Sequence, residues 1–156
     1  MKTSSTTLIR FSIAALMLAS AAWPLDTART FIGVFSNVAV SAQTGDCDGI
    51  SIQLWKLRDD TGNQKISGSF YDAGGGCPGA LWPISEAIFD ASTGRIQLVA
   101  TEGSERMVLA FKGTIESKRM KGEIGFGNGA TGEIDNWSAV ELKRLSTKEW
   151  KRIGGA

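Results

Sequence analysis

Apolar and polar side chains alternate along two neighbouring stretches in the second half of the chain. The alternation covers residues 107–115 and 120–126, and the polar residues 116–119 separate the two stretches. A period of two over this length is typical of half-buried β-strands, and the short polar break predicts a hairpin. Gly113 and Gly122 interrupt the apolar faces. Glycine there indicates a sheet that bends sharply or a backbone that is closely approached.

The same alternation predicts further strands in the rest of the chain. They cover residues 31–40, 50–57, 65–72, 84–90, 95–101 and 136–145. An apolar-x-Gly-x-apolar pattern recurs in them, at Phe31-Gly33-Phe35 and Ile66-Gly68-Phe70, and Pro83 suits only the first position of its strand.

The turns between these strands are too short to hold crossover helices, so neighbouring strands must be antiparallel and largely sequential. Eight short strands that avoid long open edges predict an all-β fold, an eight-stranded antiparallel up-and-down (meander) β-barrel. A two-sheet sandwich is the alternative, because alternation alone does not separate the two architectures.

The N-terminus has the pattern of a signal peptide over residues 1–22. Lys2 and Arg10 precede an apolar run at 11–22 that ends in small residues. The alternative is an uncleaved membrane anchor, for which the run is short. We therefore expect a periplasmic or secreted protein with no membrane span after cleavage.

We divide the remaining chain into a leader at 23–30, a barrel domain at 31–145 and a C-terminal tail at 146–156. The tail has basic residues around two apolar ones. It predicts either a short surface helix packed on the barrel or a frayed end.

Export decides how the two cysteines are interpreted. A lone pair in a small exported domain predicts a disulfide, Cys47–Cys77. A zinc site or a catalytic thiol would need histidine or another base as a partner, and the chain has no histidine. The first and third connections of an up-and-down barrel lie at one end, so both cysteines belong to the same rim.

Charge and composition exclude several function classes. The formal net charge is +1 at pH 7, which gives no electrostatic case for nucleic-acid binding. Asp46, Asp48, Asp59 and Asp60 lie in polar turns, where carboxylates are normally solvated turn formers. The sequence predicts no enzyme, no cofactor and no metal site.

The signal peptide, the meander of eight strands, the glycine pattern and the turn at 89–96 resemble the calycins, the group of lipocalins and avidins. The resemblance covers the mature domain at the level of architecture, and it implies a lipocalin-like barrel with a cup. The Gly-x-Trp motif of lipocalins has no match, because Val34 and Phe35 follow Gly33. The resemblance therefore assigns no binding residue.

Aromatic side chains are the candidates for ligand binding. Trp82 and Trp137 are expected near the disulfide rim, Trp55 leans to the opposite rim, and Tyr71 lies on the third strand. Aromatic rings at the mouth of a cup can hold a sugar, an aromatic ring or a peptide side chain. The alternative is that the large rings plug the ends of the barrel and exclude water.

Two functions follow from this sequence. We predict a barrel that binds an unknown small molecule or secreted protein at its disulfide rim, through the loops 73–82 and 127–137. The alternative is a fully plugged barrel that acts as a protein-interaction, inhibitor or structural module of the cell envelope. Large side chains that are expected to point into the barrel favour a filled interior. These are Phe35, Phe70, Phe111 and Met120.

Overall fold

A computed structural model of the 156-residue chain describes residues 28–58, 61–101 and 107–154. The predicted signal peptide and residues 23–27 of the predicted leader lie outside these ranges. The elements of the described residues are β1 (Ala28–Ser36), β2 (Ala39–Val40), β3 (Cys47–Asp48), β4 (Ile50–Arg58), β5 (Gln64–Asp72), β6 (Ala80–Asp90), β7 (Arg95–Thr101), β8 (Met107–Ile115), β9 (Arg119–Asn128), β10 (Glu133–Leu145) and α1 (Thr147–Arg152).

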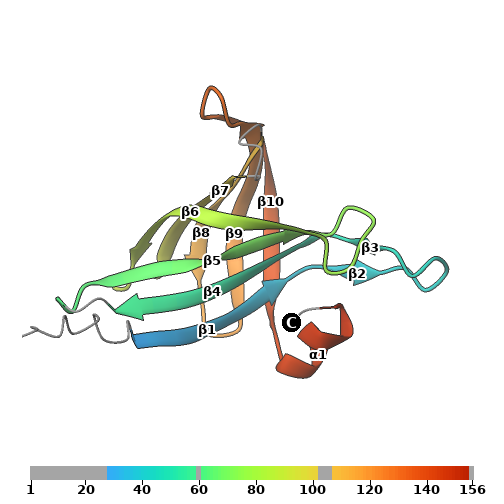
Figure 1. Ribbon diagram of the computed structural model, residues 1–156, viewed down its shortest axis with the longest axis horizontal. Coiled ribbons are helices and arrows are strands. Elements are labelled where there is room, and N and C mark those ends of the chain that lie inside the picture. The colour runs from blue at the N-terminus through green and yellow to red at the C-terminus, as the bar shows by residue number, and fades with distance from the viewer. Residues whose placement is uncertain (1–27, 59–60, 102–106, 155–156) are drawn as a thin grey trace, which may run out of the picture.

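Eight of the strands form a closed antiparallel barrel in the order β1-β10-β9-β8-β7-β6-β5-β4. From β4 to β10 each strand pairs with the next one along the chain, β1 pairs with β4 across the inserted β2–β3 ribbon, and β1 and β10 close the barrel. The predicted up-and-down barrel is therefore confirmed. The short strands β2 and β3 pair with each other in a separate ribbon that projects from one end (Figure 1).

The barrel closes through a short seam between β1 and β10. Only three residue pairs join them, from Val34–Leu145 to Ser36–Lys143, whereas β8 and β9 are paired along their length. Arg144 reaches across the seam and donates hydrogen bonds to the carbonyl oxygens of Ile32 and Ser117, the second at 3.1 Å. This side chain satisfies backbone acceptors that strand pairing leaves open.

The first strand differs from the prediction in its bounds and in which of its side chains point into the barrel. It covers Ala28–Ser36 rather than 31–40, because residues 39–40 belong to the ribbon. A register shift lies between Phe31 and Gly33, so Ile32 packs against the core while Phe31 is 51 % exposed. One extra residue in a strand moves the side chains beyond it to the opposite face. Phe31 therefore lies on the outer face, although the pattern Phe31-Gly33-Phe35 groups it with the buried Phe35.

The strand β6 begins at Ala80, earlier than predicted, and contains Pro83 in its interior. Its first residues pair with β5, up to Ser69–Pro83, and its remaining residues pair with β7, from Ile84–Ala100 onward. Pro83 therefore lies where the strand leaves one neighbour for the next. A residue without an N–H donor is tolerated at such a position.

The interior of the barrel is filled by side chains. Phe35, Phe70, Phe111 and Met120 are all buried there, as the sequence predicts. The remaining buried members of this core are Ile50, Ile52, Leu54, Trp82, Ile96, Leu98, Ala100, Leu109, Ile124 and Leu142. An eight-stranded barrel has room for such side chains or for one small ligand.

Several strand glycines lie where the backbone of a neighbouring strand leaves no room for a side chain. Gly113 and Gly122 face each other across β8 and β9. A Cβ added to either would lie 2.7 Å from the other's Cα. A Cβ on Gly68 would overlap the carbonyl oxygen of Gln53. The predicted close backbone approach is therefore present at these positions.

Replacing Gly68 by alanine should lower the free energy of unfolding by about 1–3 kcal/mol, because the backbone of β4 must move to make room. Gly76→Ala is a matched control, since no atom lies within 4 Å of a Cβ added there. We expect the control to change stability by less than about 0.5 kcal/mol. Urea unfolding of both variants measures the difference, and equal losses would contradict the close approach at Gly68.

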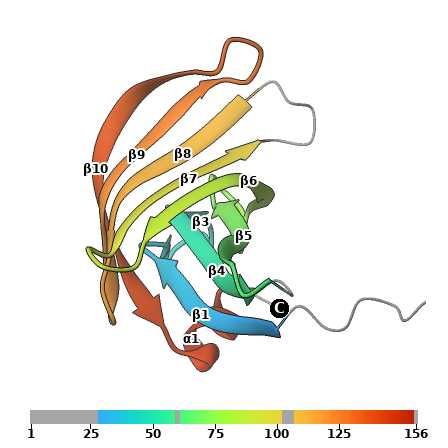
Figure 2. The ribbon, with the colours of Figure 1, turned by 90° about the vertical axis from the view of Figure 1, so that its left-hand side faces the viewer.

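The C-terminal tail forms α1, which packs on the outer face of the barrel (Figure 2). The side chains of Trp150 and Ile153 are buried and pack with Val34. The ring centroids of Trp150 and Tyr71 are 5.0 Å apart. Ser146 caps the helix and forms a capping box with Glu149. The packed helix is the first of the two arrangements expected for the tail. No helix among the described residues is long and apolar enough to cross a membrane.

Candidate functional site

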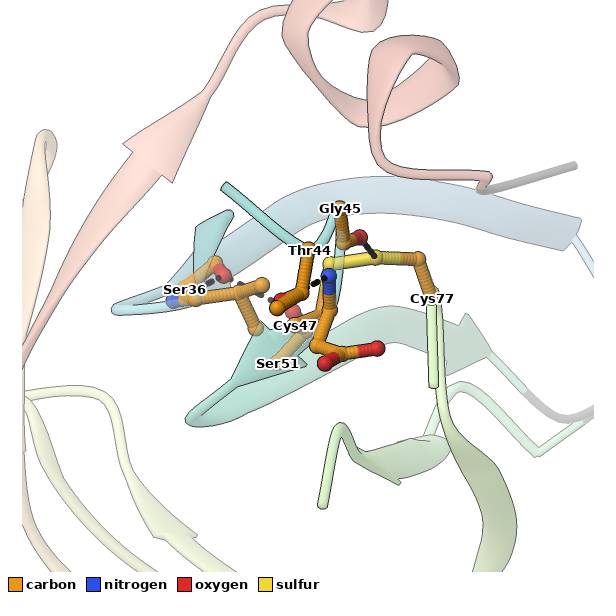
Figure 3. Close-up of a disulfide and its surroundings, with 8 residues drawn as sticks. Ser36, Thr44, Gly45, Cys47, Ser51 and Cys77 are labelled. Atoms are coloured by element: carbon orange, nitrogen blue, oxygen red, sulfur yellow. Dashed lines mark hydrogen bonds between the residues drawn. A yellow bond between two sulfur atoms is a disulfide. The ribbon is translucent and has the colours of Figure 1, made fainter. Parts of the chain in front are cut away.

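The disulfide joins two connections at one end of the barrel, as predicted. Cys47 lies in β3, within the connection between β1 and β4, and Cys77 lies in the loop at 73–79 between β5 and β6 (Figure 3). Their Cα atoms are 5.5 Å apart, within the range usual for disulfides. We call the two cross-linked segments at this end, residues 37–49 and 73–81, the disulfide rim. The loop predicted at 127–137 is shorter than expected, because residues 127–128 belong to β9 and residues 133–137 to β10.

Backbone hydrogen bonds support the cross-link between the two connections. The N–H of Gly75 donates to the carbonyl of Cys47 at 3.0 Å, and the N–H of Ala73 donates to the carbonyl of Gly49 at 2.9 Å. The two connections are therefore joined by backbone as well as by sulfur. This arrangement restricts the freedom of a glycine-rich loop that has little backbone preference of its own.

Polar side chains fix the base of the ribbon on the barrel. The hydroxyl of Ser51 donates to the hydroxyl of Ser36 at 2.8 Å, and both residues are buried. The side-chain oxygen of Asn37 accepts from the N–H of Ile50 at 2.7 Å. Buried polar groups that are satisfied in this way hold one geometry, because breaking a bond leaves an unpaired group away from water.

The tip of the ribbon is a tight turn closed by its own backbone. The N–H of Ser41 donates to Asp46 at 2.8 Å, and the N–H of Gly45 donates to Ser41 at 2.9 Å. The end of α1 lies at the same rim, since a Cβ added to Gly154 would lie 3.0 Å from the carbonyl oxygen of Cys77. Three segments distant in sequence therefore meet at this end.

Apolar side chains on the disulfide rim face solvent. Val40 of the ribbon is 49 % exposed, and Leu81, at the start of β6, is 56 % exposed. Strand alternation places Leu81 on the outer face, because its neighbour Trp82 points into the core. The rim therefore exposes one large apolar side chain on the ribbon and one at the start of β6.

The four aromatic residues predicted as a ligand site do not share one site. Trp82 is buried in the barrel core, and Tyr71 packs against Trp150 on the outer face. Trp55 is also outside, with its ring centroid 5.7 Å from that of Phe31. The structure places Trp82 inside the barrel rather than at the mouth of a cup.

Trp137 lies on the outer face of β10, across the neighbouring strand β9. The Nζ of Lys112 is 3.9 Å from the centroid of its ring, and Lys112 also pairs with Glu123 at 3.1 Å. A Cβ added to Gly125 would lie 2.8 Å from the ring of Trp137. Glycine at 125 therefore leaves space for a ring that covers the outside of the sheet.

A buried donor in the core has no partner among the described residues. The Nε1 of Trp82 is the one buried side-chain nitrogen or oxygen in this part of the chain that lacks a hydrogen bond. An unpaired N–H in an apolar interior is unfavourable, and a water molecule or another small acceptor would satisfy it.

Several described carboxylates are turn formers, caps or ion-pair partners, namely Asp90, Glu116, Glu123, Glu141 and Glu149. Asp90 accepts hydrogen bonds from Ser92 and Thr93, which lower its pKa to about 2. A carboxyl with such a pKa is a poor general acid near neutral pH. Within 28–58, 61–101 and 107–154 there is no group of three or more His, Cys, Asp or Glu side chains suited to a metal ion.

Tyr71, one of the predicted site residues, is a titratable group whose pKa is changed by burial. Burial raises the pKa of the Tyr71 phenol, whose hydroxyl donates to the side chain of Gln53 at 3.1 Å. The phenol is therefore neutral at physiological pH and acts as a hydrogen-bond donor on the outer face.

Comparisons with protein-family models, with curated proteins and with solved structures give no match.

Proposed function

We propose that this protein is an exported, non-catalytic barrel that binds a partner protein at its disulfide rim. The observation that carries the proposal is the contrast between the two parts of the molecule. The barrel interior is filled by large side chains, whereas the rim projects an ordered, cross-linked ribbon that exposes Val40, and Leu81 is exposed at the start of β6.

The rigidity of the rim supports binding to another protein. The disulfide, the backbone bonds around Gly75 and Ala73, and the Ser36–Ser51 pair hold the ribbon in one geometry before any partner arrives. A preorganised loop loses little conformational entropy on binding, which favours affinity. Inhibition of a secreted hydrolase is one activity that such a projecting loop serves.

Export and the calycin likeness are part of the proposal. A disulfide in a small domain fits an oxidising compartment such as the periplasm or the extracellular space. The likeness to lipocalins and avidins rests on the eight-stranded antiparallel closed barrel alone. It supports a stable scaffold that displays loops, which is the role proposed for it here.

Affinity capture from a mixture of exported proteins tests the proposal. The mature wild-type protein should retain a partner, and Val40→Asp and Leu81→Asp should reduce the retained amount by at least about tenfold, because each buries a charge in the interface. Ile88→Asp is the matched control. Ile88 is 68 % exposed on the same strand as Leu81 but lies near the opposite end. Equal capture by all four proteins would contradict binding at the rim.

A second candidate is a small ligand in the barrel, and the unpaired Nε1 of Trp82 supports it. Titration of tryptophan fluorescence with small apolar and sugar ligands tests this candidate. A saturable change that disappears in Trp82→Phe would favour the small ligand. The filled interior leads us to expect no saturable change with any of these ligands.

A further inference from the structure

A polar hollow lies at the end of the barrel opposite to the disulfide rim. Its volume is about 340 Å³, and Thr30, Lys56, Arg58 and Gln64 line it. The strand register explains the grouping, since Thr30 pairs with Lys56 and Gln64 pairs with Arg58. Leu54 is buried in the core, so Lys56 and Arg58 continue the same inner face of β4 toward the open end.

Basic residues gather on the three strands that line this hollow, β1, β4 and β5. Arg29, Lys56, Arg58 and Lys65 lie on β1, β4 and β5, and the carboxylate within these strands is Asp72, at the other end of β5. Within the described residues of these strands the cations outnumber the carboxylates, and such an excess attracts anions. Asp59 and Asp60, which follow Arg58 in sequence, lie outside the described residues.

Lys56 and Arg58 differ from the other two cations in their surroundings. Arg29 lies over the ring of Trp55 at 4.2 Å, and Lys65 points to the outer face by strand alternation. None of the ion pairs among the described residues includes Lys56 or Arg58. The turn at 59–60 lies outside those residues and is not part of the site.

We propose that this hollow binds a compact oxyanion, the carboxylate or phosphate group of a ligand. The guanidinium of Arg58 offers parallel donors to two oxygens, and Lys56 adds a point charge. The hydroxyl of Thr30 and the amide of Gln64 supply neutral donors. Two cations that share one hollow repel each other, so a bound anion stabilises both.

The filled core limits what the site can hold. Ile66 pairs with Lys56 on the inner face and packs against the core, together with Ile32 and Ile115. Ile66 and Ile32 therefore occupy the inner face next to the hollow, on the side of the core. The charged group binds at the mouth, and the rest of the ligand extends into solvent.

Titration with inorganic phosphate and with acetate, followed by the amide signals in an NMR spectrum of the mature protein, tests the site. We expect saturable shifts at Thr30, Lys56, Arg58 and Gln64. Lys56→Gln and Arg58→Gln should each weaken binding by about tenfold, since each removes a charged hydrogen-bond donor. Saturation by phosphate alone or by acetate alone identifies which oxyanion the site prefers.

Lys65→Gln is the matched control, because it removes the same charge from the same end but from the outer face. It should leave the affinity within about twofold of the wild type, since exposed charges act weakly at a distance through water. The amide spectrum of each variant reports whether it is folded, and Arg58 is exposed enough that its replacement keeps the fold. The proposal is overturned if neither anion gives saturable shifts, or if Lys65→Gln weakens binding as much as Lys56→Gln.

Discussion

Replacing Cys47 and Cys77 together by alanine should lower the free energy of unfolding by roughly 3–4 kcal/mol. The two residues are 30 positions apart in sequence, so the cross-link removes much of the loop-closure entropy of the unfolded chain. The loss should appear as a lower midpoint in urea.

The reduced wild-type protein is the control for this variant. It should lose a similar amount of stability, since reduction also removes the constraint on the unfolded chain. If the double variant unfolds at the same urea concentration as the oxidised wild type, the cross-link is not a main source of stability.

Replacing Phe70 by alanine should lower the free energy of unfolding by about 3–5 kcal/mol, because it leaves a cavity in a closely packed core. Phe70 is fully buried and lies between Ile52 on β4 and Trp82 on β6 in the strand register. The surrounding strands are held in a closed barrel, so they relax only partly into the space. Thermal or urea unfolding measures the loss.

Phe31→Ala is the matched control for Phe70→Ala. The same atoms are removed, but Phe31 is half exposed on the outer face and contacts the ring of Trp55. We expect this substitution to lower the free energy of unfolding by about 1 kcal/mol or less. Equal costs at the two positions would show that Phe31 faces inward, and would contradict the register shift between Phe31 and Gly33.

The barrel could be predicted because its strongest signals are local. Alternation along 107–126 defines the β8–β9 hairpin, and the observed register pairs Phe111 with Ile124 on the inner face. Short polar turns exclude crossover helices, which leaves an antiparallel meander. The disulfide could be predicted because the chain has two cysteines and a signal-peptide pattern, and the meander topology places both cysteines at one end, because odd-numbered connections share it.

The sequence does not reveal where a strand takes up an extra residue. The shift at Phe31–Gly33 and a second one between Asp135 and Ser138 change which face the neighbouring side chains occupy. Asn136, inside the second shift, has a φ of 53°. Such an irregularity depends on the partner strand and on closure of the barrel, and alternation within one strand carries no signal for it.

The projecting ribbon was also missed. Its strands β2 and β3 are two residues long each, too short for a period of two to be recognised. Residues 43–49 are rich in turn formers, and this is the signal that a turn lies there. In the structure Val40 pairs with Cys47, beside the disulfide and the hydrogen bond from Ile50 to Asn37.

The outward position of Trp55 had a signal in the sequence. It belongs to the alternate set of β4 with Ser51 and Gln53, opposite to Ile52 and Leu54. Alternation therefore separates Trp55 from the core side chains, and the structure places it on the outer face beside Phe31. The strand pattern predicts on which face of the sheet an aromatic side chain lies. Only the three-dimensional fold shows whether several such side chains form one site.

An NMR titration with labelled isoleucine and leucine methyl groups and backbone amides tests the central claim, a filled barrel that binds at its rim. Small apolar and sugar ligands should leave the core methyl signals of Ile52, Leu98 and Leu142 unchanged. A partner protein obtained by capture should shift the amide signals of residues 37–49 and 73–81. Saturable shifts of the core methyl signals with a small ligand, and none at the rim with the partner, would contradict the claim.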